Sequence, residues 1–291
     1  MIFAGVELGG TKCVAILAND AENVLARKVV ATTSPEETLG KVETILADWK
    51  DGPGFDALGI ASFGPIDVDP NSPKYGHLRA TTKPGWSGAD IGPRLQRTSG
   101  VPMALDTDVN GAAFAEMRWG SGRGMDDFAY ITVGTGVGVG LIVNGKPTRG
   151  FGHAELGHIR VARLADDDWP GACKFHGDCV EGIASGLSLK ARFGDGVDHL
   201  GHDHPVWESV VWALAQLGHA IVCTAAPRRI AIGGGVIGRQ AHLLERIEAK
   251  LVESLNGYVH LPDDGPYIRA PELGDDAGPL GAIALAMNVR P

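Results

Sequence analysis

The chain has 291 residues, of which 44% are hydrophobic and 21% are charged, and its formal net charge is −9. This composition is ordinary for a globular protein with a sizeable core, and the negative charge argues against nucleic acid and anionic membranes as main partners. No apolar run approaches the roughly 20 residues of a membrane-spanning helix, and the N-terminus has neither a basic segment nor a cleavage pattern, so we expect a mature, cytoplasmic protein.

The predicted elements begin with a hairpin that turns on glycine. Strands are expected at residues 2–8, 13–17 and 24–30, and the first two are joined by Gly9, Gly10, Thr11 and Lys12. Ser34 can cap a following helix and Pro35 suits its first turn. A buried strand is expected at 57–62, and the loop from 64 to 90 is too long to be a simple connection.

Two carboxylates follow the next predicted strand. A short helix is expected at 91–98, and the apolar strand from Met103 to Leu105 leads into Asp106 and Asp108, before a helix that opens at Asn110. A strand end beside a helix start is where α/β enzymes place reacting groups, so Asp108 is the candidate for chemistry. Asp108 could also cap the helix, which would not exclude catalysis, and Asp106 is interpreted as structural.

A second glycine hairpin repeats the form of the first. Residues 131–143 form an apolar strand, a turn of Gly134, Thr135 and Gly136, and another apolar strand. Such a turn offers backbone N–H groups without a bulky Cβ to obstruct a phosphate. We interpret the two hairpins as a distant internal duplication with one phosphate-facing turn each. A carboxylate beside an anion cradle indicates phosphoryl transfer onto a hydroxyl.

The remaining chain is irregular from about Gly150 to Cys179 and then mainly helical. Helices are expected at 181–193, 205–226, 240–256 and 277–288, with short strands at 229–232 and 267–270 and a glycine turn at 233–235.

The irregular stretch contains a possible metal site. Cys173, His176 and Cys179 have C-x2-H-x2-C spacing, and His153 and His158 precede them. A structural zinc site needs four nitrogen or sulfur ligands in a tetrahedron, which these cysteines, His176 and one upstream histidine would supply. Free thiols and imidazoles, or a catalytic zinc with an open position, are the alternatives. With no secretion signal, we do not expect disulfides.

Several of these motifs together carry a family likeness. The chain resembles the ROK family of sugar kinases, within the actin-like ATPase superfamily, and most of all its fructokinase branch. The matching pieces are Glu7-Leu-Gly-Gly-Thr-Lys12, Gly64-Pro-Ile-Asp67, Tyr75-Gly, Thr82-Lys-Pro-Gly-Trp86, Asp108-Val-Asn110, Gly134-Thr-Gly-Val-Gly138, Glu155-Leu-Gly-His158, Phe175-His-Gly-Asp-Cys-Val-Glu-Gly182 and Gly233-Gly-Gly-Val236.

The chain departs from the family pattern at three positions. Many members have a Cys-x-Cys-x4-Cys loop, whereas this chain has His176 between two cysteines. The arrangement with His176 is similar to the fructokinase version. Glu7 replaces the Asp of many relatives, and either carboxylate can hold a metal-bound water. Thr107 stands where relatives often have Asn, so the sugar contact of that Asn is not carried over to this chain.

The resemblance implies a role for each matching residue. Asp108 would be the general base, and His158 would be the fourth zinc ligand, with its other ring nitrogen facing the sugar pocket. The sugar pocket would be formed by Gly64, Pro65, Asn110, Glu155, His158 and Glu181. The ATP site, with Mg2+ on the phosphates, would be formed by Gly9, Gly10, Thr11, Lys12, Gly134, Thr135, Gly136, Gly233, Gly234, Gly235 and Val236. Zinc would be held by His158, Cys173, His176 and Cys179.

The resemblance also implies a fold and an activity. We expect an α/β protein with the two-lobed, ribonuclease H-like fold of actin-like ATPases and a cleft between lobes 1–117 and 118–291, the last helix, about 277–289, crossing back to the first lobe. The expected function is an ATP-dependent fructokinase that acts as a homodimer. Alternatives are a kinase for glucose, mannose or an N-acetylated hexosamine, a sugar-responsive regulator, and a zinc-stabilised binding protein. The regulator is disfavoured because no DNA-binding helices precede the first strand.

Overall fold

The computed structural model describes residues 1–289 and divides the chain into two compact units. The first unit contains Met1–Gly124, Pro147–His153 and the segment that begins at Asp275, and the second contains Met125–Lys146 and Ala154–Gly274. The expected division at residue 117 falls inside a helix, α3 (Asp108–Trp119), that lies wholly in the first unit. Segment 147–153, expected in the second lobe, also belongs to the first unit.

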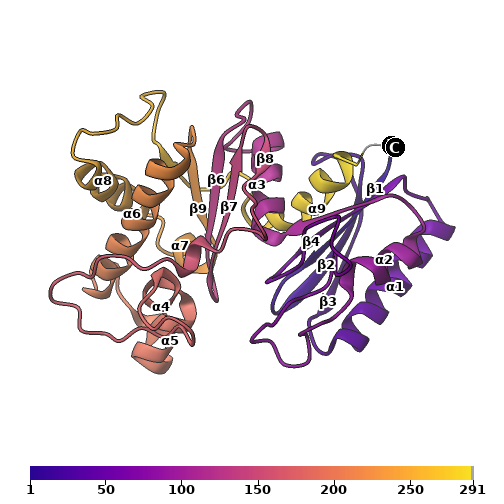
Figure 1. Ribbon diagram of the computed structural model, residues 1–291, viewed down its shortest axis with the longest axis horizontal. Coiled ribbons are helices and arrows are strands. Elements are labelled where there is room, and N and C mark those ends of the chain that lie inside the picture. The colour runs from indigo at the N-terminus through magenta and orange to yellow at the C-terminus, as the bar shows by residue number, and fades with distance from the viewer. Residues whose placement is uncertain (290–291) are drawn as a thin grey trace. The chain divides into compact units, whose positions relative to one another are not determined.

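The first unit is built on a five-stranded sheet (Figure 1). Its order is β3-β2-β1-β4-β5, with β1 antiparallel to β2 and parallel to β4. The strands are β1 (Phe3–Leu8), β2 (Lys12–Ala18), β3 (Val24–Ala31), β4 (Ala57–Ser62) and β5 (Met103–Thr107). All six residues of β4 are buried, as a central parallel strand covered on both faces requires.

Helices cover both faces of this sheet (Figure 1). On one face lie α1 (Pro35–Asp51) and α2 (Ile91–Ser99), and the Ser34 hydroxyl accepts a hydrogen bond from the N–H of Glu37 at 3.3 Å, as predicted for the helix cap. On the other face lies α9 (Ala277–Met287). A Cβ on Gly59 of β4 would lie 1.8 Å from the carbonyl oxygen of Ala282, so only glycine admits this helix.

The second unit repeats the strand order of the first. Its sheet has the order β10-β9-β6-β7-β8, with β6 antiparallel to β7 and parallel to β9. The strands are β6 (Phe128–Val133), β7 (Val137–Val143), β8 (Lys146–Pro147), β9 (Ile230–Gly233) and β10 (Ile268–Arg269). In each unit a hairpin and a third strand are followed by two parallel strands, which agrees with the predicted internal duplication.

Helices of the second unit share one hydrophobic cluster with its sheet. The helices are η1 (Leu156–His158), α4 (Val180–Ala184), α5 (Gly186–Phe193), η2 (Gly194–His199), α6 (Val206–Ala225), α7 (Gly235–Gly238) and α8 (Leu243–Leu255); η3 (Gly274–Asp276) precedes α9. The single helix expected at 181–193 is two helices. Ser185 has an extended backbone between them, and its hydroxyl accepts the N–H of Ser188 at 3.1 Å to cap α5.

One helix is apolar over a length that the sequence analysis did not expect of a membrane-spanning segment. By length and composition alone, α6 could cross a membrane, contrary to the expectation from the sequence, but 67% of its apolar window is buried. Val210, Leu214 and Ile221 of α6 pack in one cluster with Ile230 of β9 and Leu251 of α8. The helix is therefore a core element of the second unit.

Candidate active site

The candidate base, Asp108, is the first residue of α3 and directly follows β5. The structure assigns the cap to its neighbour instead, because the Thr107 hydroxyl accepts the N–H of Asn110 at 3.2 Å. An oxygen of Asp108 accepts the N–H of Val109 at 2.9 Å, and the side chain is half-buried. Asp108 therefore lies in the first turn of α3, where a negative charge interacts favourably with the helix dipole.

A buried network lies beside this carboxylate. Asp106 is 1% exposed, and its Oδ1 accepts the N–H of Thr107 and the amide of Asn110, both at 2.8 Å. Its Oδ2 accepts a hydrogen bond from Arg149, which also donates to the carbonyl of Val68 at 3.1 Å. Asp106 is thus a structural carboxylate, as interpreted from the sequence. Because one N–H of the Asn110 amide is used, its Oδ1 and second N–H can serve a ligand.

The loop after β4 is held by a histidine that was considered for the metal. Gly64 and Pro65 form a cis peptide bond, and the next N–H, from Ile66, donates to Nε2 of His153 at 3.2 Å. Both partners lie in the first unit. A Cβ on Gly64 would come within 3.3 Å of the His153 ring. His153 therefore supports the loop expected to bind sugar and is absent from the metal-binding group.

The first glycine turn is compact and open to solvent. The N–H of Gly9 donates to the carbonyl of Lys12 at 3.0 Å, and the Thr32 hydroxyl donates to the carbonyl of Gly9 at 2.8 Å. Gly10, Thr11 and Lys12 are exposed. Glu7 lies beside the turn in β1; burial is the main cause that raises its pKa, and the charges of Lys12 and Arg27 partly offset this effect.

The second glycine turn is tied to the helices that follow the cysteines. The N–H of Gly186, at the start of α5, donates to the carbonyl of Gly134 at 2.7 Å, and Oε2 of Glu181 accepts the N–H of Val137 at 3.1 Å. A Cβ on Gly136 would lie 2.5 Å from that carboxylate oxygen. Glu181, expected to bind sugar, therefore also fixes the turn. Its Oε1 lies 3.9 Å from Nδ1 of His158.

The third glycine run ends β9 and opens α7. Gly234 has a φ of +88°, and a Cβ there would lie 2.6 Å from the backbone nitrogen and oxygen of Val133. A Cβ on Gly233 would meet the ring of Pro271 at 2.6 Å. Close backbone approach explains both glycines. Gly233 and Val236 are buried and Gly235 is exposed, so the run reaches the surface at Gly235 and returns to the core at Val236.

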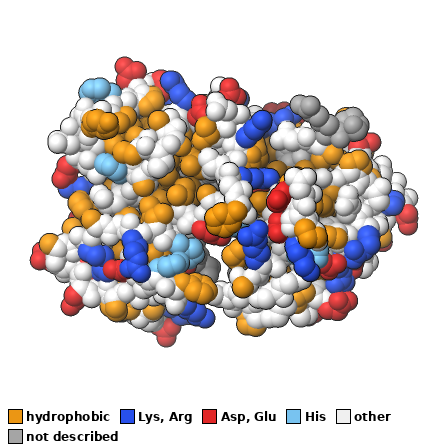
Figure 2. Space-filling view, in the orientation of Figure 1, with side chains coloured by type: hydrophobic (Ala, Val, Ile, Leu, Met, Phe, Trp, Pro, Cys, Tyr) orange, Lys and Arg blue, Asp and Glu red, His pale blue; other side chains and the backbone are white. Residues whose placement is uncertain are grey.

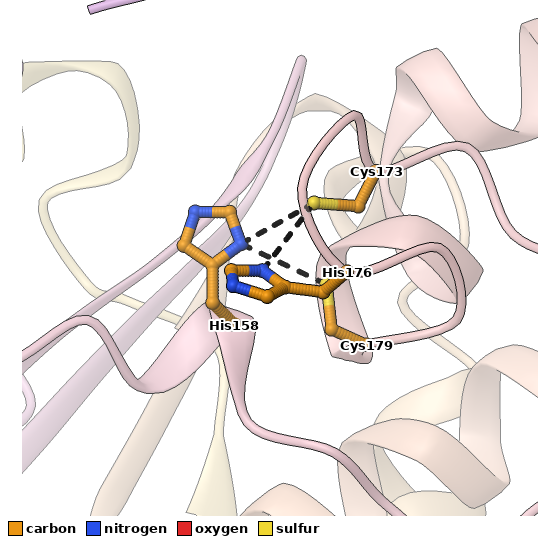
Figure 3. A group of neighbouring side chains, drawn as sticks. All are labelled: His158, Cys173, His176 and Cys179. Atoms are coloured by element: carbon orange, nitrogen blue, oxygen red, sulfur yellow. Dashed lines mark hydrogen bonds between the residues drawn. The ribbon is translucent and has the colours of Figure 1, made fainter. Parts of the chain in front are cut away.

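The four predicted metal ligands meet at one point of the second unit (Figure 3). His158 ends η1, Cys173 and His176 lie in the loop before α4, and Cys179 adjoins that helix. Nδ1 of His158 lies 3.6 Å from Sγ of Cys173 and 3.7 Å from Sγ of Cys179, and Nδ1 of His176 lies 3.6 Å from Sγ of Cys173. Tetrahedral zinc with ordinary Zn–S and Zn–N bonds would separate such atoms by about 3.6 Å. The donor set therefore fits zinc.

The cysteines are free thiols, and their burial differs from one to another. Cys13 and Cys179 are buried, and burial is the first cause that raises the pKa of the Cys179 thiol to about 11. A bound cation would favour the thiolate instead. Cys223 is exposed near the end of α6. No disulfide is formed in the described part of the chain.

A pocket of about 440 Å³ in the second unit was not predicted from the sequence. Its apolar lining includes Leu189 and Trp207, and Val236 brings the third glycine run to its wall. Gln240 also lines it, with a buried Oε1 that has no hydrogen-bond partner in the described part of the chain. Apolar side chains beside an open acceptor suit a flat base that carries an amino group. The lining residues come from α5, η2, α6 and the end of α7, so no single sequence motif predicts the pocket.

Almost the whole chain is similar to known proteins. The model of the ROK family matches residues 3–289. The fructokinase of Zymomonas mobilis is 39% identical over 293 residues, which cover 98% of this chain and 96% of that protein. Among solved structures, the ROK hexokinase of Thermus thermophilus has a TM-score of 0.79 at 26% identity, covering 99% of this chain and 98% of that one.

A second solved structure carries ligands. The ROK family glucokinase of Streptomyces griseus, in complex with glucose and AMPPNP, has a TM-score of 0.72 at 27% identity and covers 99% of both chains. These likenesses confirm the family resemblance found from the motifs. They also confirm the predicted class of fold, the two-lobed α/β fold of actin-like ATPases.

Proposed function

Because the chain belongs to the ROK family, we propose that this phosphotransferase is an ATP-dependent fructokinase, which converts D-fructose and ATP into fructose 6-phosphate and ADP. The observation that carries the proposal is Asp108, a carboxylate at the first turn of α3 in a chain that is 39% identical to a fructokinase over almost its full length. Fructokinases of Lactococcus lactis and Pediococcus pentosaceus, at 35% and 37% identity, support the same substrate.

In the proposed mechanism Asp108 takes the proton from the hydroxyl on carbon 6 of the sugar. The hydroxyl oxygen then forms a bond to the terminal phosphorus of ATP while the bond from that phosphorus to the bridging oxygen breaks. Thr107 caps α3 instead of Asp108, and the Asp108 carboxylate is held at the helix start, where one of its oxygens accepts the N–H of Val109. Phosphoryl transfer depends mainly on such positioning and on charge neutralisation.

The residues that would bind the sugar are those expected from the family motifs. Asn110 would offer its Oδ1 and one N–H, because Asp106 already holds the other N–H. The backbone of Gly64 and Pro65 would border the sugar on the loop that His153 supports. Glu155 precedes η1, and His158 ends it. With Nδ1 of His158 among the metal donors, its Nε2 would serve the sugar, as would the oxygen of Glu181 not used by Val137.

Three glycine runs and the second-unit pocket would bind ATP. Gly9 to Lys12 and Gly134 to Gly136 would cradle the phosphates, since both turns expose backbone with little side chain. Gly233 to Val236 would border the nucleoside, which the pocket next to Val236 would hold. Mg2+ would shield the phosphate charge near the Glu7 carboxylate, since a hard cation takes oxygen ligands.

Zinc would be held by His158, Cys173, His176 and Cys179 as a closed structural site. The four donors lie within 4.8 Å of one another, which leaves no open position for substrate. Bound zinc would supply folding energy to the loop rather than take part in the transfer. His158 is itself a donor and Glu181 lies two residues after Cys179, so the metal would keep two sugar contacts in place.

The proposal includes a cytoplasmic homodimer that does not act on nucleic acid or membranes. On the face drawn in Figure 2, basic side chains are scattered among acidic and apolar ones and form no continuous stripe.

The test of the proposed function is ADP release from Mg-ATP with fructose, glucose, mannose, N-acetylmannosamine or no sugar. Strong turnover on fructose is expected. Turnover on another hexose alone would reassign the substrate, and a folded, metal-loaded protein inactive on all sugars would favour a regulator.

A further inference from the structure

Lys83 joins the long loop of the first unit to the first glycine turn. Its Nζ donates a hydrogen bond to the carbonyl of Gly10 at 2.6 Å, although 73 residues separate the two in sequence. Both residues lie in the first unit. Lys83 belongs to the motif Thr82-Lys-Pro-Gly-Trp86, and the mechanism proposed above assigns no role to this lysine.

The backbone of Lys83 lies in a turn that is fixed by contacts of Trp86. Trp86 is fully buried, its indole N–H donates to the carbonyl of Thr33 at 2.7 Å, and its ring meets that of Phe63 edge-on at 5.3 Å. The N–H of Trp86 also donates to the carbonyl of Lys83 at 3.2 Å. Trp86 is therefore an anchor for the loop, and the backbone of Lys83 is fixed three residues before it.

The first glycine turn, which Lys83 contacts, has backbone N–H groups that can donate hydrogen bonds to a ligand. The N–H of Gly9 is used within the turn, and the N–H of Thr32 occupies the carbonyl of Thr11 at 2.9 Å. The N–H groups of Gly10 and Thr11 have no partner among the residues that the structure describes, and both residues are exposed. Consecutive open N–H groups form a concavity that binds anions.

The two lysines at this turn differ in their charge environment. Lys12 acts on the carboxylate of Glu7, so part of its positive field is already offset. Lys83 contacts a neutral carbonyl, and within residues 1–289 it forms no ion pair. A carbonyl oxygen is a weaker partner for an ammonium group than a phosphate oxygen. Lys83 therefore brings the less compensated positive charge to the turn.

We propose that Lys83 is a further catalytic residue, whose ammonium group moves from the Gly10 carbonyl to an oxygen of the terminal phosphate of ATP. The inference rests on the proposed function, since it assumes that the turn binds the triphosphate. Lys83 keeps its proton throughout. It neutralises the charge that spreads over the phosphoryl oxygens while the bond to the sugar forms and the bond to ADP breaks.

The test compares Lys83→Met and Lys83→Arg with Lys74→Met as the matched control. Lys74 is an exposed lysine of the same loop, and only its backbone forms hydrogen bonds among the described residues. We expect Lys83→Met to lower kcat for fructose by about 100-fold, Lys83→Arg to restore part of the loss, and Lys74→Met to leave it unchanged. Calorimetric titration should show weaker binding of Mg-AMPPNP to Lys83→Met with unchanged binding of AMP, which lacks the outer phosphates.

The titration separates this inference from the proposed function. If the wild type binds Mg-AMPPNP but phosphorylates no sugar, the fructokinase proposal fails and the binding comparison still decides the role of Lys83. Equal Mg-AMPPNP affinity and a kcat within threefold of the wild type in Lys83→Met would overturn the role. Equal loss for AMP and Mg-AMPPNP, with a lower melting temperature, would make Lys83 a loop anchor only. Lys83→Arg supplies the comparison if Lys83→Met does not fold.

Discussion

The guanidinium of Arg149 and the carboxylate of Asp106 form an ion pair inside the first unit, and the same carboxylate accepts the amide of Asn110. Segment 147–153 leaves the second unit after Lys146 and returns to it at Ala154. This short passage supplies Arg149 to the base of α3 and His153 to the loop after β4. Two expected sugar contacts thus depend on a segment that carries no sequence motif.

Arg149→Met is expected to lower the free energy of unfolding by about 3 kcal/mol, because it leaves the Asp106 carboxylate buried without its counter-charge. The KM for fructose should rise as well, since Asn110 loses its fixed partner, while the KM for ATP should change little. Urea unfolding and steady-state kinetics measure these effects. Arg97→Met, which removes an exposed pair with Asp90, is the control and should cost less than about 1 kcal/mol. Equal losses in the two variants would contradict the role of Arg149.

Asp108→Asn is expected to lower kcat by at least about 10³-fold, because the amide cannot take the sugar proton. The melting temperature should stay close to that of the wild type, since Thr107 caps α3. Thr107→Val is the complementary variant and should lose about 1 kcal/mol of stability. Activity of Asp108→Asn within tenfold of the wild type would reject its role as the base.

Cys179→Ser is expected to lower the zinc-to-protein ratio and the melting temperature together, because Cys179 is the buried member of the four-residue group. Elemental analysis and calorimetry test this. Cys223→Ser, at an exposed cysteine outside the group, should change neither. Removal of metal from the wild type with a chelator should reproduce the loss of stability. An unchanged metal content in Cys179→Ser would count against the zinc site.

Glu7→Gln is expected to raise stability at neutral pH while it lowers activity. Burial raises the pKa of Glu7 in the folded state, so the folded protein binds its proton more tightly than the unfolded chain. Stability should therefore fall as pH rises from the ordinary Glu pKa through the raised one, and Glu7→Gln should remove this slope. Unfolding measured across that window, with exposed Glu22→Gln as control, decides. A slope retained in Glu7→Gln would refute the assignment.

Gln240→Leu is expected to reduce the preference for ATP over ITP. The buried Oε1 of Gln240 can accept a hydrogen bond from the 6-amino group of adenine, and hypoxanthine has a carbonyl at that position. The ratio of kcat/KM for the two nucleotides measures the preference. Gln96→Leu, an exposed position on α2, should not alter it. An unchanged ratio in Gln240→Leu would remove Gln240 from the nucleobase contact.

The sequence predicts those features whose causes are local. The bounds of β4 follow from an unbroken apolar run, and the start of α1 follows from Ser34 and Pro35. The break between α4 and α5 was missed because Ser185 caps a helix in the middle of an otherwise helical pattern. Spacing alone left His153 and His158 equivalent as ligands, since it cannot reveal that His153 serves the first unit.

The features that the sequence does not predict depend on distant partners. Lys83 meets Gly10 across 73 residues, and Arg149 meets Asp106 across 43. In the sequence alone, a lysine or arginine of a loop that makes such a contact cannot be distinguished from one that is solvated at the surface. The pocket near Gln240 likewise assembles from several helices. Such residues are recognised only when the fold fixes which side chains share a volume.

The closeness of α9 to the first sheet has a consequence for the order of synthesis. A Cβ on Gly281 would lie 2.3 Å from the backbone of Gly111 in α3, and a Cβ on Gly59 would lie 1.8 Å from the carbonyl oxygen of Ala282. The sheet face of the first unit therefore stays uncovered until the ribosome has made residues 277–287. The second unit is complete at Gly274, so it can fold before the first unit has received its last helix.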